Sequence, residues 1–146
     1  MKFSVALAQV SPFLGNLEKN LEKCEQIIEQ AIRDRVDLIV FPELTLTGYF
    51  VKDIVDSVAI TRDSPILKKL LGYSKRISIV IGAVEETPEF KFHNSAFYLE
   101  GGEIVHTHRK VYLPTYGLFD EHRYLAPGSR IRAFDTKFGR MAILIC

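Results

Sequence analysis

The sequence has few cysteines, little net charge and no long apolar run, and each of these absences excludes a class of protein. Two cysteines among 146 residues are too few for the disulfide framework of a small secreted protein, so we expect a reducing, cytoplasmic setting. A formal net charge of +1 gives no reason to expect a nucleic acid or a membrane surface as partner. The apolar runs are also far too short to span a bilayer.

A β-α-β unit is predicted at the start of the chain, and it lacks the glycine-rich turn of a dinucleotide-binding fold. Residues 3–10 and 38–41 are apolar enough for buried strands, and between them apolar residues recur at helical spacing after Asn16, a good N-cap. The crossover favours parallel strands. Because no G-x-G-x-x-G follows the first strand, we do not expect a dinucleotide site there. Cys24 lies on the apolar stripe of the helix and is interpreted as a buried structural residue.

A second helix, a third buried strand, a hairpin and a final strand pair are predicted further along. Ser64-Pro65 is typical of a helix start, and Gly101-Gly102 is typical of a hairpin turn. Residues 111–130 have little periodicity, and such long loops usually serve a function. The last strand is apolar to its end, so we expect either that the chain is part of a longer one or that its final cysteine is itself unusual. The predicted strands are residues 77–84, 94–99, 103–108, 131–135 and 140–146, with a polar loop at 85–92.

Three residues with reactive or charged side chains follow or end predicted strands: Glu43, Lys110 and Cys146. Open α/β sheets place their chemistry at the carboxyl ends of strands. A nearby cation favours the thiolate form of a cysteine, and a carboxylate can accept and return its proton. Each residue also has a structural interpretation: Glu43 as a cap or ion-pair partner, Lys110 as a solvated hairpin end, and Cys146 as a buried strand residue. Spacing alone does not show that the three meet.

The segments around these residues resemble the three signature motifs of the nitrilase (carbon–nitrogen hydrolase) superfamily, in the family's order. The resemblance covers essentially the whole chain and makes residues 1–146 the N-terminal portion of a single carbon–nitrogen hydrolase domain. Such domains run to roughly twice this length, so the chain would supply about the N-terminal half of an α/β fold, the four-layer α-β-β-α sandwich. The matching segments are Phe41-Pro42-Glu43-Leu44, His108-Arg109-Lys110-Val111-Tyr112-Leu113-Pro114 and Ile143-Leu144-Ile145-Cys146.

The resemblance implies hydrolysis of a small amide or nitrile through a thioester intermediate, with no cofactor or metal and with pairing into dimers. Carried over position by position, Glu43 is the general base, Lys110 the transition-state stabiliser and Cys146 the nucleophile. Glu121 corresponds to the family's second, supporting glutamate. Tyr116 and Phe119 would face the substrate, although these aromatic residues could instead pack the loop onto the sheet.

Several alternatives stay open. Residues 41–49 and 113–124 most resemble the glutaminase domains of glutamine-dependent NAD synthetases, which would pass ammonia to a second domain. The acidic residue and the tryptophan that often follow the family's cysteine do not occur in this sequence. His106 and His108 have the period-2 spacing that puts two side chains on one face of a strand, so with Glu43 they could form the metal site of a metallohydrolase. Histidines on a hairpin usually sit at the surface, which disfavours that site. The last alternative is a non-catalytic interaction domain.

Overall fold

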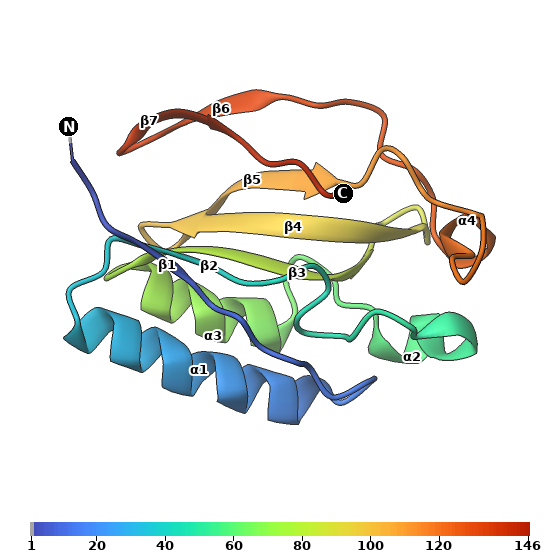
Figure 1. The fold of residues 1–146 in the computed structure, drawn as a ribbon, viewed down its shortest axis with the longest axis horizontal. Helices are drawn as coiled ribbons and strands as arrows, with labels where there is room; N and C mark the ends of the chain where they lie inside the picture. The colour runs from blue at the N-terminus through green and yellow to red at the C-terminus, as the bar shows by residue number, and fades with distance from the viewer. Residues whose placement is uncertain (1) are drawn as a thin grey trace.

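A five-stranded mixed sheet organises residues 2–146, the part of the chain that the computed structural model describes (Figure 1). The strand order is β1-β2-β3-β4-β5, with parallel pairing from β1 to β3 and antiparallel pairing from β3 to β5. The predicted β-α-β unit with parallel strands is therefore confirmed. The strands are β1 (Val5–Leu7), β2 (Leu38–Val40), β3 (Ser78–Glu86), β4 (Phe92–Glu100) and β5 (Glu103–Arg109).

Two helices, α1 (Leu17–Arg33) and α3 (Pro65–Ser74), cover one face of this sheet (Figure 1). Their predicted starts are confirmed, because the side chains of Asn16 and Ser64 each accept a hydrogen bond from a backbone N–H in the first helical turn. The main core lies between the helices and the sheet, where apolar residues from α1, α3, β3 and β4 pack together, among them Ile28, Leu67, Ile79 and Phe97. No helix within residues 2–146 combines the length and apolar character needed to cross a membrane.

The opposite face of the sheet carries a small antiparallel ribbon made of β6 (Ala133–Thr136) and β7 (Gly139–Ala142). Phe134 of β6 packs on Tyr98 and on the ring of His106, which leave the sheet on the side away from the helices. The α/β fold class is thus confirmed. The helical layer and the main sheet supply two layers of the predicted sandwich.

Three predicted boundaries are wrong. Strand β1 has three residues instead of eight, and Val5 and Leu7 are exposed because β1 is an edge strand with helix packing on one face only. Strand β3 continues through Glu85 and Glu86, which pair with β4 in place of the predicted polar loop. Strand β7 ends at Ala142, and the predicted core segment 143–146 has alternating exposure, since within residues 2–146 no strand pairs with it.

Two short helices lie at the end of the sheet where the catalytic candidates are. Helix α2 (Val55–Val58) follows the 3-10 turn η1 (Lys52–Ile54), and α4 (Glu121–Tyr124) interrupts the long loop predicted at 111–130. Apolar residues in and next to these short helices form a second small core with β3 and the turn after β2, made of Leu44, Val51, Val58, Val84 and Leu125.

Candidate active site

Glu43 lies in the turn that follows β2, and a glycine on the neighbouring strand fixes the course of that turn. The Leu46 N–H donates to the Gly82 carbonyl at 3.0 Å. A Cβ at position 82 would lie 2.6 Å from the Leu44 nitrogen, so only glycine lets the turn pass so close to β3. Leu44 itself has φ +52°, a conformation that a leucine rarely adopts. The turn that carries Glu43 therefore has an uncommon backbone conformation.

Lys110 lies immediately after β5, and its ammonium group joins two carboxylates. Its backbone N–H donates to the Asn94 carbonyl at 2.8 Å, which extends the β4–β5 pairing by one residue. Its Nζ donates to Glu43 Oε1 at 2.9 Å and to Glu121 Oε1 at 2.8 Å. The Lys110 side chain is 2% exposed, against 28% for Glu43 and 7% for Glu121. The structure thus brings together three of the predicted site residues.

The charge of Lys110 is maintained by its partners. Burial disfavours the ammonium form, but the hydrogen bonds and the charges of Glu121 and Glu43 outweigh it, so the pKa of Lys110 is raised above its usual value. An ammonium has three N–H donors, and two of them are used by these carboxylates. The third has no hydrogen-bond partner among residues 2–146.

Glu121 is the most enclosed carboxylate of the site. Its backbone N–H donates to the Pro114 carbonyl at 3.1 Å, and its Oε1 accepts from the Tyr49 hydroxyl as well as from Lys110. Burial, followed by the hydrogen bond to Glu121, raises the pKa of Tyr49. Within residues 2–146 the buried Oε2 atom of Glu121 has no hydrogen-bond partner. Glu121 is therefore placed to hold Lys110 and has little access to solvent.

Asn94 of β4 is a member of the site that sequence reasoning missed. Its Nδ2 donates to Glu43 Oε1 at 2.6 Å, so the same carboxylate oxygen accepts from both Asn94 and Lys110. Tyr49 and Gly82 were missed as well. The usable signal for Asn94 was an asparagine inside a predicted strand, where that residue is depleted.

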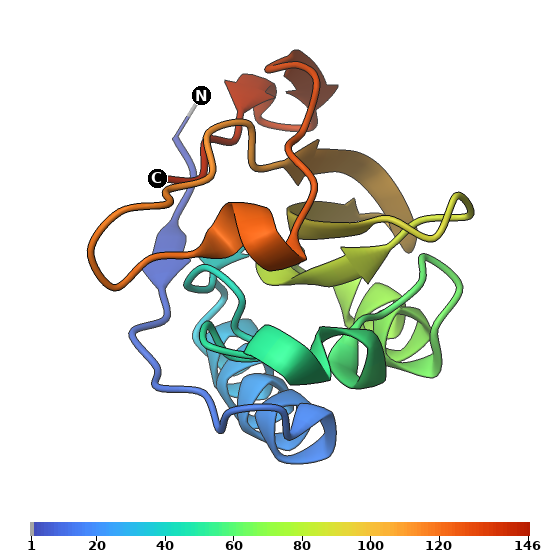
Figure 2. The same ribbon diagram turned by 90° about the vertical axis from the view of Figure 1, so that its right-hand side faces the viewer.

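Cys146 lines the same pocket as Glu43 and Lys110. This pocket, here called the Glu43–Lys110 pocket, has a volume of about 700 Å³ and is lined mainly by the loop of residues 111–119, including Tyr116 and Phe119. Figure 2 shows this loop beside the C-terminal end of the chain. Cys146 is free and exposed, so the alternative interpretation of Cys146 as a buried strand residue is wrong. Tyr116 and Phe119 are exposed as well, and Phe119 packs edge-on against both Tyr116 and Tyr49.

The other cysteine and the strand histidines lie outside the pocket's charged centre. Cys24 is fully buried, as predicted, and burial raises its pKa to about 12. His108 is buried and the ring of His106 stacks on Phe134, so the expectation of surface histidines is wrong. Among residues 2–146 no group of three or more histidine, cysteine or acidic side chains is arranged to hold a metal ion.

The arrangement unites the groups that nucleophilic hydrolysis requires. Cys146 lines the pocket, a partly exposed carboxylate can exchange a proton there, and a buried ammonium can stabilise negative charge. Glu121 accepts a hydrogen bond from the Lys110 ammonium, and Asn94 donates one to the Glu43 carboxylate.

Comparison with known proteins agrees with this chemistry. A family model described as carbon-nitrogen hydrolase matches residues 4–146. The glutamine-dependent NAD(+) synthetase of Acinetobacter baylyi is 33% identical over 99% of this chain and 27% of its own length. The citrullinase of Francisella tularensis is 31% identical over 97% of this chain and 52% of its own length.

Solved structures give the same result. The glutamine-dependent NAD+ synthetase from Acinetobacter baumannii has a TM-score of 0.84 at 33% identity, covering 99% of this chain and 27% of that one. Saccharomyces cerevisiae Nit3, a member of branch 10 of the nitrilase superfamily, has a TM-score of 0.81 at 27% identity, covering 97% and 54%. The chain therefore spans about a quarter of the length of the NAD synthetases and about half of the length of the shorter relatives.

Proposed function

Because this chain belongs to the carbon–nitrogen hydrolase family, we propose that it hydrolyses a non-peptide C–N bond of a small amide or nitrile, with Cys146 as nucleophile. The observation that carries the proposal is the Lys110 ammonium, held between Glu43 and Glu121 in the pocket that Cys146 also lines. Amide hydrolysis needs a nucleophile, a proton carrier and a stabiliser of the oxyanion. The pocket offers one group for each task.

In the first half of the proposed reaction on an amide, Glu43 takes the proton of the Cys146 thiol as sulfur bonds to the carbonyl carbon. The third N–H of Lys110 donates to the oxyanion that forms. Glu43 then gives its proton to the leaving nitrogen, the C–N bond breaks, and ammonia or an amine departs from a thioester. Glu43 suits this exchange because it is the more exposed of the two carboxylates bound to Lys110.

In the second half, Glu43 takes a proton from a water molecule whose oxygen attacks the thioester carbonyl. The carbon–sulfur bond breaks, the sulfur regains its proton from Glu43, and the carboxylic acid leaves. Glu121 and Asn94 are positioning residues in this scheme, since Glu121 contacts Lys110 and Asn94 contacts Glu43. Tyr116 and Phe119 are proposed to contact the substrate because both line the pocket.

A glutaminase function is the second candidate, in which the ammonia released from glutamine is passed to a synthetase. It is favoured by the NAD synthetase relatives, which match 99% of this chain with about a third of the residues identical. Citrullinase and a probable nitrilase also match. The two candidates share one chemistry and differ in the substrate.

The test is release of ammonia from L-glutamine, L-citrulline, a simple aliphatic amide and an aliphatic nitrile. We expect turnover of at least one substrate and a mass increase equal to its acyl group on Cys146 during turnover. C146A should abolish both, whereas C24A is the matched control because Cys24 is buried away from the pocket. Preference for glutamine would favour the glutaminase.

Three outcomes would refute the cysteine mechanism. Substantial turnover by C146A would exclude the nucleophile. Loss of activity with a chelator but not with a thiol alkylator would favour the metallohydrolase with His106 and His108. No acyl adduct with any substrate of the panel would favour a non-catalytic interaction domain.

Self-association and a cytoplasmic location are further parts of the proposal. They rest on the family resemblance and on cysteine usage, respectively. Light scattering on the purified protein would test the expected dimer, and a monomer at all concentrations would refute it.

A further inference from the structure

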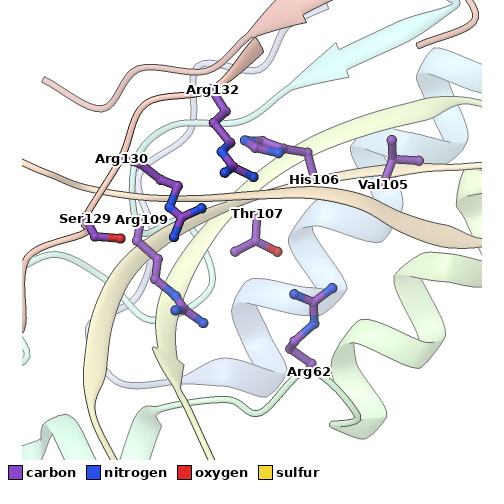
Figure 3. A pocket seen from close by; sticks show the side chains of 8 residues that line it. All are labelled: Arg62, Val105, His106, Thr107, Arg109, Ser129, Arg130 and Arg132. Atoms are coloured by element: carbon purple, nitrogen blue, oxygen red, sulfur yellow. The ribbon is translucent and has the colours of Figure 1, made fainter. Parts of the chain in front are cut away.

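A second pocket lies at the edge of the sheet along β5, and four arginines surround it (Figure 3). It has a volume of about 400 Å³ and shares no lining residue with the Glu43–Lys110 pocket. Figure 3 shows the four guanidinium groups directed toward a common space from different parts of the chain. This arginine pocket is formed by Arg62, Arg109, Arg130 and Arg132 together with Val105, His106, Thr107 and Ser129.

The fold assembles these arginines by docking one segment against the end of β5. The Gly128 N–H donates to the Lys110 carbonyl at 2.7 Å. A Cβ at position 128 would lie 2.2 Å from the Arg109 carbonyl oxygen, so the approach requires glycine. Beyond this point the segment carries Arg130 and Arg132 past Arg109. Arg62 reaches the same space from the loop before α3.

The positive charge of the arginine pocket is only partly compensated. Arg109 donates to both carboxylate oxygens of Glu85, at 2.8 and 2.9 Å, and Glu89 adds a weaker attraction to Arg109. Within residues 2–146, none of the other three arginines is in an ion pair. Like charges that converge without a counter-ion repel one another, so a bound anion would reduce the repulsion among these arginines.

Two buried polar atoms in the wall of the arginine pocket also lack partners. His106 Nε2 and Thr107 Oγ1 are shielded from solvent, and neither has a hydrogen-bond partner among residues 2–146. Buried polar atoms are normally paired, and an unpaired one calls for an explanation. Both atoms are shielded from solvent and lie behind the surface of the pocket, so the charge of the arginines carries the argument for a ligand.

We propose that the arginine pocket binds the phosphate groups of a small molecule with two or more phosphates. Guanidinium groups bind phosphate oxygens bidentately, and three uncompensated arginines match the charge of a diphosphate. The volume lies within the range of small-molecule sites. An acidic protein segment is the less favoured occupant, because stable protein interfaces cover a much larger surface than one concave site. The proposal does not depend on the hydrolase function.

Calorimetric titration with inorganic pyrophosphate tests this site directly, with ADP as a second probe and inorganic phosphate for comparison. We expect saturable binding of pyrophosphate, stronger than that of phosphate and weakened by added salt. R130Q and R132Q should each weaken binding roughly tenfold, the typical effect of one lost charged hydrogen bond, and R62Q should do the same. Tighter binding of ADP than of pyrophosphate would indicate that the pocket also contacts a nucleoside.

The matched control is R140Q, because Arg140 is exposed and pairs with Asp135 on the β6–β7 ribbon, outside the arginine pocket. It should bind pyrophosphate like the unmodified protein. All four substituted arginines are exposed, so unfolding temperatures should be unchanged, and the three separate pocket variants guard against one that misfolds. Absence of pyrophosphate binding, or equal weakening by R140Q, would overturn the proposal. Binding of an acidic peptide but not of pyrophosphate would also overturn it, in favour of a protein partner.

Discussion

Replacement of Lys110 by methionine removes the ammonium and nearly preserves the length of the side chain. In the native protein this ammonium is the shared donor to Glu43 and Glu121, and it is almost fully buried. K110M therefore leaves two carboxylates facing each other without their cation. Glu43 is partly exposed and can be hydrated, whereas Glu121 is enclosed. Most of the energetic cost should arise at Glu121.

Removal of one partner from a buried ion pair costs about 3–5 kcal/mol of the free energy of unfolding. For a domain of this size that corresponds to a fall of roughly 10 °C in the melting temperature. A neutral side chain at the position of the enclosed carboxylate is cheaper to bury than an unpaired charge. K110M/E121Q should regain much of the lost stability for the same reason. It should regain no activity, which we expect to fall by about 10²–10³ when the oxyanion donor is lost.

Urea unfolding of each variant at neutral pH measures these differences. The matched control is K69M. Lys69 donates to Glu25 at the same 2.8 Å, but its side chain is 56% exposed, so this change should cost at most about 1 kcal/mol. If K110M were no less stable than K69M, or if K110M/E121Q were no more stable than K110M, the Lys110 ammonium would not compensate two carboxylates in the folded protein.

Three further predictions concern the surroundings of this centre. G82A should lower kcat strongly and the free energy of unfolding by about 1–3 kcal/mol, because the new methyl group would meet the Leu44 backbone; activity and urea unfolding check both. N94L should lower kcat roughly tenfold by removing a hydrogen bond of about 1.5 kcal/mol or more to Glu43, with little change in KM; an unchanged kcat would rule out a positioning role. Burial lowers the pKa of His108, so the unfolded chain binds a proton at this residue at a higher pH than the folded protein does. The free energy of unfolding should therefore fall as the pH drops below about 6.5, and it should fall less in H108Q.

Local sequence patterns were sufficient for most of the elements. Asn16 and Ser64 marked helix starts because their side chains cap backbone N–H groups within the same turn. Gly101-Gly102 marked the β4–β5 turn for a similarly local reason, the positive φ angles that both residues adopt. Such signals act over a few residues, and the chain contains them in full. The fold class followed from their order.

The burial of individual residues could not be predicted from local sequence patterns in the same way. The apolar residues of β1 and of segment 143–146 looked like core, yet several are exposed, since burial depends on which neighbours cover a strand. Glu85 looked like loop because a charged residue is rare in a buried strand. It is buried in β3 because Arg109, which is 24 positions away in the sequence, pairs with it.

For the candidate site, too, the sequence predicted some features and only the structure revealed others. The sequence by itself determined the identity of Glu43, Lys110, Glu121 and Cys146 as candidates, through short motifs. Only the tertiary structure decided that Lys110 joins Glu43 and Glu121, that Asn94 supports Glu43, and that four arginines share a second pocket. Motifs record residue types over short distances, whereas the contact between Lys110 and Glu43 joins positions that are 67 residues apart. They form only when β4 and β5 pair and the loops pack at the end of the sheet.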